Sequence, residues 1–222
     1  DKLSIHDYRD SDIQNFLLAA EELTKRGYYV IRMGAVVNQP FKTSNEKIID
    51  YAYKGLRTDF MDIYLGAKCE FCVTTGTGFD GVPMIFRRPL VYVNYVPLYH
   101  IHIGSSKYIS IPKHHYSKKL ERRLTAKEII NSDCFYGRDS QTFSIEDVEL
   151  IDNSPEEIRD VVLEMHKKIN NEEFMDDEDK NLQTKFWDIF PNQRKYSGNI
   201  YYGKRKSTIG SKFLRENQWW LE

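Results

Sequence analysis

The sequence has no excess of basic residues, few cysteines and no long apolar run, and each absence excludes a class of protein. Its 222 residues carry 32 Lys and Arg against 33 Asp and Glu, whereas proteins that bind bulk nucleic acid show a clear basic excess. No stretch approaches the roughly 20 apolar residues of a membrane span. Local basic runs such as 113–119 are interpreted as solvated faces. Hydrophobic residues make up 41%, enough for a folded core.

The chain has only three cysteines, Cys69, Cys72 and Cys134. Cys69 and Cys72 form a CxxC motif, but no second pair and no histidine pair follows at ligand spacing. We therefore expect both to pack in the core rather than to bind metal or perform redox chemistry. An odd number of cysteines without a signal peptide favours a reducing compartment, the cytoplasm.

Histidines gather in one region of the sequence but lack the pattern of a metal site. They are His100, His102, His114 and His115. The alternating first pair could share one face of a strand, yet no third ligand has a defined spacing. We therefore expect no metal ion.

Alternating strand and helix patterns fill the first half of the chain. Strands are expected at 3–5, 28–33, 69–73 and 90–93, and helices at 12–26, 46–53, 59–65 and 80–86. This order is typical of a parallel sheet with right-handed crossovers. Further on we expect a strand at 108–111 and helices at 125–132, 155–170, 184–190 and 207–221. The prediction is a Rossmann-like α/β domain at 1–152 with a helical C-terminal extension at 153–222 that packs on it.

The most informative stretch joins an expected strand to an expected helix. Thr74-Thr75-Gly76-Thr77-Gly78 follows the strand at 69–73, and Phe79-Asp80 precedes the helix. The threonine hydroxyls can donate to phosphate oxygens, and the glycines allow close approach of the backbone. The turn has neither the Gly-Lys-Ser/Thr of a Walker loop nor the spacing of GxGxxG. Asp80 is either part of this site or the cap of its helix.

Two arginines also follow expected strands. Arg9 lies between the strand at 3–5 and the helix at 12–26, and Arg32 ends the strand at 28–33. Carboxyl ends of parallel strands share one edge of the sheet, where such folds bind ligands, and a guanidinium suits a diphosphate. The alternatives are a surface pair of Arg9 with Asp7 or Asp10, and a structural salt bridge for Arg32.

The combination of these motifs resembles a group of bacterial glycosyltransferases found in surface-polysaccharide gene clusters. The motifs are HDYRDSD at 6–12, GYYVIRMG at 27–34, DFMD at 59–62 and TTGTG at 74–78. The resemblance covers residues 5–96 and, more loosely, 154–169. It implies a GT-B enzyme, of which this chain is mainly the C-terminal, nucleotide-sugar-binding half.

The resemblance also implies where the donor binds. In similar enzymes the donor phosphates rest on a small-residue loop and helix N-terminus, which match Thr75 to Phe79, and an arginine after the first strand touches the diphosphate, which matches Arg9. No metal ion and no other cofactor is expected. Asp10-Ser11-Asp12 has the spelling of a DxD motif but is expected to cap a helix.

The chain is short for a complete GT-B enzyme, which needs a second half to hold the acceptor. We therefore expect a longer protein or a partner chain. The expected substrates are a nucleotide sugar and a glycan or lipid-linked acceptor. The expected location is the cytoplasm, including the inner face of the membrane. The alternative is a non-catalytic nucleotide- or sugar-binding module. The residues do not specify the catalytic base, the sugar or the nucleotide.

Overall fold

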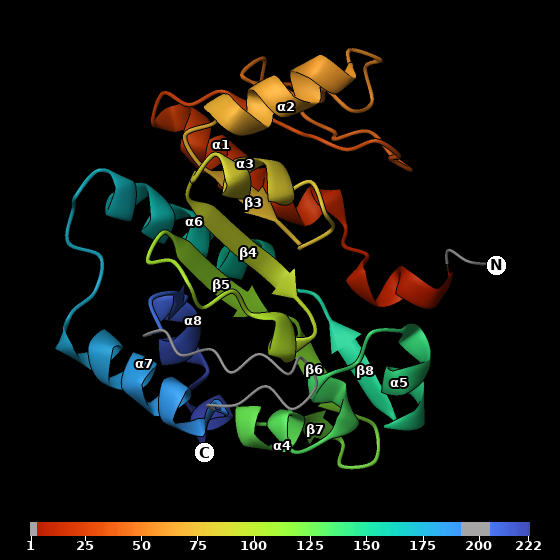
Figure 1. The fold of residues 1–222 in the computed structure, drawn as a ribbon, viewed down its shortest axis with the longest axis vertical. Helices are drawn as coiled ribbons and strands as arrows, with labels where there is room; N and C mark the ends of the chain where they lie inside the picture. Colours follow the sequence, from red (N-terminus) through yellow and green to blue (C-terminus); the bar gives the residue numbers. More distant parts are fainter. Residues whose placement is uncertain (1–3, 192–204) are drawn as a thin grey trace.

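The centre of the computed structural model is a parallel sheet, and residues 4–191 and 205–222 are described. Its strands have the order β3-β4-β5-β9 and comprise Cys72–Thr74, Leu90–Tyr95, Tyr108–Pro112 and Thr208–Ile209 (Figure 1). Every residue of β4 is buried, as expected of a parallel strand covered on both faces. The predicted α/β class with a parallel sheet flanked by helices is confirmed.

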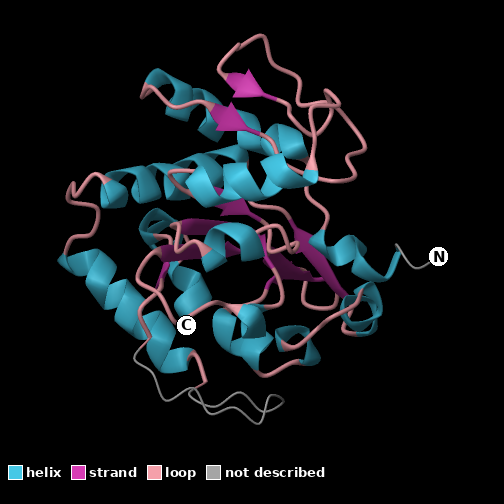
Figure 2. Ribbon diagram, turned by 45° about the horizontal axis from the view of Figure 1, so that its top comes forward, coloured by secondary structure: helices cyan, strands magenta, loops and turns pink. Residues whose placement is uncertain are grey.

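Two smaller sheets accompany the central one in the described residues. Val30–Ile31 (β1) pairs in parallel with Ile48–Ile49 (β2), and Figure 2 shows this pair as two small arrows apart from the main sheet. The antiparallel sheet has the order β7-β6-β8, from Arg122–Arg123, His114–Ser117 and Val148–Ile151. The first pair thus stands beside the main sheet without joining its hydrogen-bond ladder.

Helix α6, Pro155–Ile169, packs against β4 and β5. Its capping box is formed as the sequence predicts, because the Ser154 hydroxyl accepts the Glu157 N–H and the Glu157 carboxylate accepts the Ser154 N–H. Helix α1, Leu17–Lys25, lies on α6 and ends before Gly27, whose φ of +93° is that of a C′ glycine. The two helices form the layer that supports this side of the sheet.

The remaining helices other than α5, which was not predicted, follow the predicted positions with changed bounds. With α5 included, they are α2 Asp59–Lys68, α3 Gly81–Ile85, α4 Ala126–Ile130, α5 Ser140–Ile145, α7 Asp177–Ile189 and α8 Ser211–Glu216. Helix α7 begins earlier than the expected 184 because the Asp176 carboxylate caps it by accepting the Asp179 N–H. The expected end of α2 at Gly66 is also wrong.

Gly66 is buried inside α2, where it lets the helix approach α3. A Cβ on this residue would lie 2.7 Å from Cγ1 of Val82. Its role is therefore close packing rather than termination.

Two predicted elements of the first half are wrong. The strand at 3–5 is replaced by a 3-10 helix, Ser4–Arg9, while Leu3 lies outside the described residues. The helix at 46–53 is replaced by β2 and a turn, because Ile48 and Ile49 pair with Val30 and Ile31. β-branched residues favour this extended pairing over a helix.

The C-terminal extension is more than helical. Its strand β9 pairs in parallel with β5 and completes the sheet. The outer edge of β9 is covered by Gln183 of α7, whose amide donates to the Ile209 carbonyl and accepts the Ile209 N–H. One hydrophobic cluster contains buried side chains from both parts of the chain, for example Leu90 of β4 and Trp220 near the C-terminus. Residues 153–222 therefore contribute to the same core as the rest.

Candidate functional site

A cavity of about 610 Å³ brings together residues from several of the predicted motifs. It lies between β1 and β3, and residues of α1, the end of α2 and Val162 of α6 complete its lining. Of the predicted site residues, the lining includes Arg9, Arg32, Thr74, Thr75, Thr77 and Phe79. Gly76, Gly78 and Asp80 are not among the lining residues. Arg9 and the threonine–glycine turn thus border one cavity, at the end of the sheet where β3 terminates.

Arg9 presents a guanidinium without a carboxylate partner in the described part of the chain. Its Nε donates to the Tyr8 hydroxyl at 2.8 Å, and the guanidinium carbon lies 5.2 Å from the centre of the same ring. Tyr8 itself is buried. The alternative, a surface pair with Asp7 or Asp10, is not found among the described residues, so the positive charge of Arg9 is oriented by an aromatic ring and left available to an anion.

The segment that carries Arg9 is fixed to the carboxyl ends of β4 and β5. The buried Lys113 ammonium donates to the Asp10 carbonyl at 2.6 Å and pairs with Asp152 at 2.9 Å. The Asn94 side chain donates to the Ser11 hydroxyl at 3.0 Å. The interpretation of residues 113–119 as solvated is therefore wrong for Lys113, which is 5% exposed.

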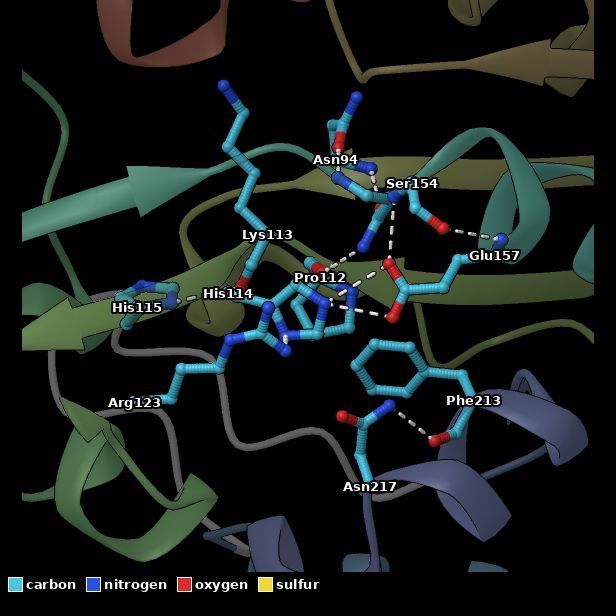
Figure 3. Close-up of polar contacts among 11 residues, drawn as sticks. Asn94, Pro112, Lys113, His114, His115, Arg123, Ser154, Glu157, Phe213 and Asn217 are labelled. Atoms are coloured by element: carbon cyan, nitrogen blue, oxygen red, sulfur yellow. Dashed lines mark hydrogen bonds and ion pairs between the residues drawn. The ribbon is translucent and has the colours of Figure 1, made fainter. Parts of the chain in front are cut away.

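Asn94 in turn belongs to a buried clamp of two asparagines (Figure 3). The Asn94 N–H donates to the Asn153 side chain at 2.6 Å, and the Asn153 N–H donates to the Asn94 side chain at 2.5 Å. Asn153 also donates to the Pro112 carbonyl at 2.8 Å. The clamp joins β4, β5 and the start of α6. Nothing in residue spacing indicates that two asparagines 59 positions apart pair.

The threonine–glycine turn keeps part of its backbone available. The Gly76 N–H donates to the Thr74 hydroxyl at 3.0 Å, and the Gly78 N–H donates to the Asp80 carboxylate at 2.8 Å. The N–H groups of the alternating residues Thr75, Thr77 and Phe79 have no hydrogen-bond partner among the described residues. Gly76 has a φ of +78°, and a Cβ there would lie 2.8 Å from the Tyr95 ring. This position therefore requires glycine.

Asp80 holds the turn from behind. It is buried, and besides the Gly78 N–H it accepts the Tyr92 hydroxyl at 3.4 Å. Burial first, and then the charge of Asp80, raise the pKa of Tyr92. Asp80 occupies the N-cap position of α3, but the alternative of a side-chain cap is not found, because the side chain makes no capping bond to that helix. Its position behind the turn is that of a support rather than of a phosphate contact.

Arg32 forms the structural salt bridge that was the alternative to ligand contact. Its guanidinium lies 3.3 Å from the Asp50 carboxylate, and both side chains are at most 10% exposed. It also donates to the Gln39 carbonyl at 2.6 Å. Asp50 further accepts the Phe41 N–H at 2.7 Å. Arg32 therefore lines the cavity with its charge already compensated.

A second polar cluster at this side of the sheet was not predicted (Figure 3). Nε2 of the buried His114 lies 2.9 Å from the Glu157 carboxylate, and the ring stacks on Phe213. Burial raises the pKa of Glu157, but the bonds and charge from His114 and the Ser154 N–H outweigh it and lower the pKa below its usual value. Glu157 therefore joins β6 to the first turn of α6.

The other residues considered in the sequence form no site of their own, although Cys69 and Cys72 line the cavity. Asp12 caps the 3-10 helix Ile13–Phe16 by accepting the Gln14 N–H, as expected. Cys69 follows α2 rather than lying on a strand, Cys72 is on β3, and all three cysteines are free thiols. Within residues 4–191 and 205–222, no three His, Cys, Asp or Glu side chains are grouped as metal ligands. None of the helices in these ranges has both the length and the apolar character needed to cross a bilayer.

Comparisons of the chain with protein-family models, with curated proteins and with solved structures found no match. The function must therefore be inferred from the motifs and from the geometry of the cavity.

Proposed function

We propose that this chain is the donor-binding part of a glycosyltransferase, which transfers a sugar from a nucleotide-diphosphate sugar to a glycan or lipid-linked acceptor in surface-polysaccharide synthesis. The motif resemblance supports the reaction and the GT-B type, without a metal ion. The acceptor class favours action in the cytoplasm at the inner face of the membrane. One observation carries the proposal, namely that Arg9 and the Thr74–Phe79 turn border the same cavity.

The chemistry of donor binding suits the groups present. Transfer of the sugar leaves a nucleoside diphosphate, whose developing negative charge must be stabilised. The guanidinium of Arg9 supplies positive charge, and the N–H groups of Thr75, Thr77 and Phe79 supply donors without other partners among the described residues. The Thr75 and Thr77 hydroxyls add further donors. We assign the diphosphate to these groups.

The other predicted donor-binding residues support the site indirectly in this proposal. Gly76 and Gly78 give the turn its shape, both with positive φ. Thr74 and Asp80 accept the N–H groups of these glycines. Arg32 fixes the wall of the cavity through Asp50. The turn is thus preorganised before an anion arrives, which lowers the cost of binding.

The test is binding of UDP, GDP, ADP and CMP and their sugars, measured by thermal shift and calorimetry. At least one diphosphate nucleotide should stabilise the chain. Arg9→Ala should weaken its binding about tenfold or more, since a charge-assisted hydrogen bond contributes about 1.5–3 kcal/mol. Arg26→Ala is the matched control, because Arg26 lies at the end of α1 and pairs with Glu22. Equal binding by both variants, or binding of no nucleotide, would refute the proposal.

Binding and transfer are separated by a product assay. Release of nucleoside diphosphate from a nucleotide sugar in the presence of glycan acceptors supports the enzyme. Saturable nucleotide binding without release or transfer under any of these conditions assigns the chain instead to the class of binding modules.

A further inference from the structure

Two strand edges face each other across the cavity. β3 is an edge strand of the main sheet, and among the described strands β1 pairs with β2 alone. The cavity is lined by the continuous stretches 28–34, which contains β1, and 69–75, which contains β3. The space between β1 and β3 is called the strand slot below.

On each side of the strand slot, one backbone N–H of the bordering strand has no hydrogen-bond partner among the described residues. In β1, the N–H groups of Val30 and Arg32 donate to Lys47 and Ile49 at 2.9 Å. Because strand backbone groups alternate in direction, the N–H of Ile31 points away from β2. In the same way the Cys72 N–H donates to Pro89 beside β4, so the N–H of Val73 points away from β4. Neither the Ile31 nor the Val73 N–H has a partner among the described residues.

The order of the strands places the slot where a doubly wound sheet has its first strand. Across the slot, the strands run β2-β1-slot-β3-β4-β5. A doubly wound sheet has the order 3-2-1-4-5-6, in which the first strand lies between the second and the fourth. The slot has the position of that first strand. Such a strand would lead through α1 into β1 as a right-handed crossover.

We propose that an extended polypeptide strand, joined to the chain ahead of Asp1, fills the strand slot and pairs with both β1 and β3. An apolar ligand in the same place would leave the Ile31 and Val73 N–H groups without hydrogen bonds, which is costly. A strand between them offers backbone carbonyls to both. Side chains on one of its faces would meet the apolar residues Phe16, Ala19 and Val162, which line the same cavity. The inference goes beyond nucleotide binding, which is assigned to the end of the slot.

The experiment compares two fusions of the full chain. One carries seven strand-forming residues (Val, Ile and Thr) ahead of Asp1, and the matched control carries the same length with Gly-Pro at its centre. Amide hydrogen exchange is measured without nucleotide. In the unextended chain, Ile31 and Val73 should exchange faster than the paired Val30 and Cys72. The strand-forming fusion should slow exchange at both Ile31 and Val73 at least tenfold, and the control should not.

A Val73→Pro variant tests whether the protection depends on pairing with β3. Val73→Pro removes one N–H that faces the slot, at an edge position that tolerates proline, and should reduce the protection that the fusion gives to Ile31. Protection of neither amide, of only one of them, or equally by both fusions would overturn the proposal. Arg9→Ala should leave the protection unchanged, so loss of nucleotide binding and failure of strand pairing are distinguishable.

Discussion

Arg9 and Arg32 border the same cavity but have opposite surroundings. Within residues 4–191 and 205–222, Arg9 hydrogen-bonds to Tyr8 and forms no ion pair, whereas Arg32 is compensated by the buried Asp50. Because both arginines follow expected strands, the sequence predicts that their side chains lie near the edge of the sheet where ligands bind. It does not predict that Asp50 neutralises the charge of Arg32, because Asp50 lies in a loop that the sequence patterns assign to a helix.

The Arg32–Asp50 pair should matter for stability. Asp50→Asn removes the charge that compensates a guanidinium which is 10% exposed, and should lower the free energy of unfolding by about 3 kcal/mol. Chemical denaturation measures this change. Glu22→Gln, which breaks an exposed pair on α1, should leave the free energy nearly unchanged. Equal effects of the two substitutions would show that the Arg32 pair is not structural.

His115 should make the fold sensitive to acid. It is buried, its Nδ1 donates to the Lys113 carbonyl at 3.1 Å, and burial lowers its pKa to about 4. A histidine of the unfolded chain titrates near pH 6.5. Between pH 6.5 and 4 the unfolded chain binds more protons, so the free energy of unfolding falls with falling pH, by about 3 kcal/mol at the lower end.

Denaturation at several pH values tests this assignment. His115→Gln, which cannot titrate, should flatten the pH profile in this window. His6→Gln, the same substitution at an exposed histidine, provides the control. A profile that His115→Gln does not alter would contradict a buried neutral His115.

At the scale of elements, the threonine–glycine turn depends on how α2 and α3 pack. Gly66→Ala would place a methyl group 2.7 Å from Val82, a stiff β-branched side chain. We expect a loss of stability of about 1–3 kcal/mol, despite the better helix propensity of alanine. Adding Val82→Ala should restore part of it. Thermal and chemical denaturation of both variants measure these changes. If Gly66→Ala alone stabilised the protein, the close packing of Gly66 against Val82 would be contradicted.

Sequence patterns predict long elements here better than short ones. α6 is fixed by a local signal, the Ser154–Glu157 capping box, and was found as predicted. β2 and β9 have only two residues each, so their patterns carry little information and their pairing partners decide the structure. The Asn94–Asn153 clamp was missed because its partners are distant in the sequence and no local pattern marks them. The Thr74–Gly78 turn has a local pattern, and it was placed correctly between a strand and a helix.

At the scale of the whole molecule, the C-terminal residues are part of the sheet rather than an appendage. A chain that ends at Asn170 lacks α7, β9 and α8, and with them the Gln183 cover of the sheet edge. We expect it to show no cooperative thermal transition in circular dichroism. Gln183→Ala in the complete chain should instead keep the transition at a lower temperature. A cooperative fold of the shortened chain would support a separable extension.

The central claim concerns a diphosphate held by Arg9 and the threonine–glycine turn. It is tested most directly by amide resonances during titration with the nucleoside diphosphate that binds best. We expect saturable shifts at the N–H groups of Thr75, Thr77 and Phe79, which are strongly reduced in Arg9→Ala. Saturable binding that leaves these three resonances in place, or that shifts them equally without Arg9, would contradict it.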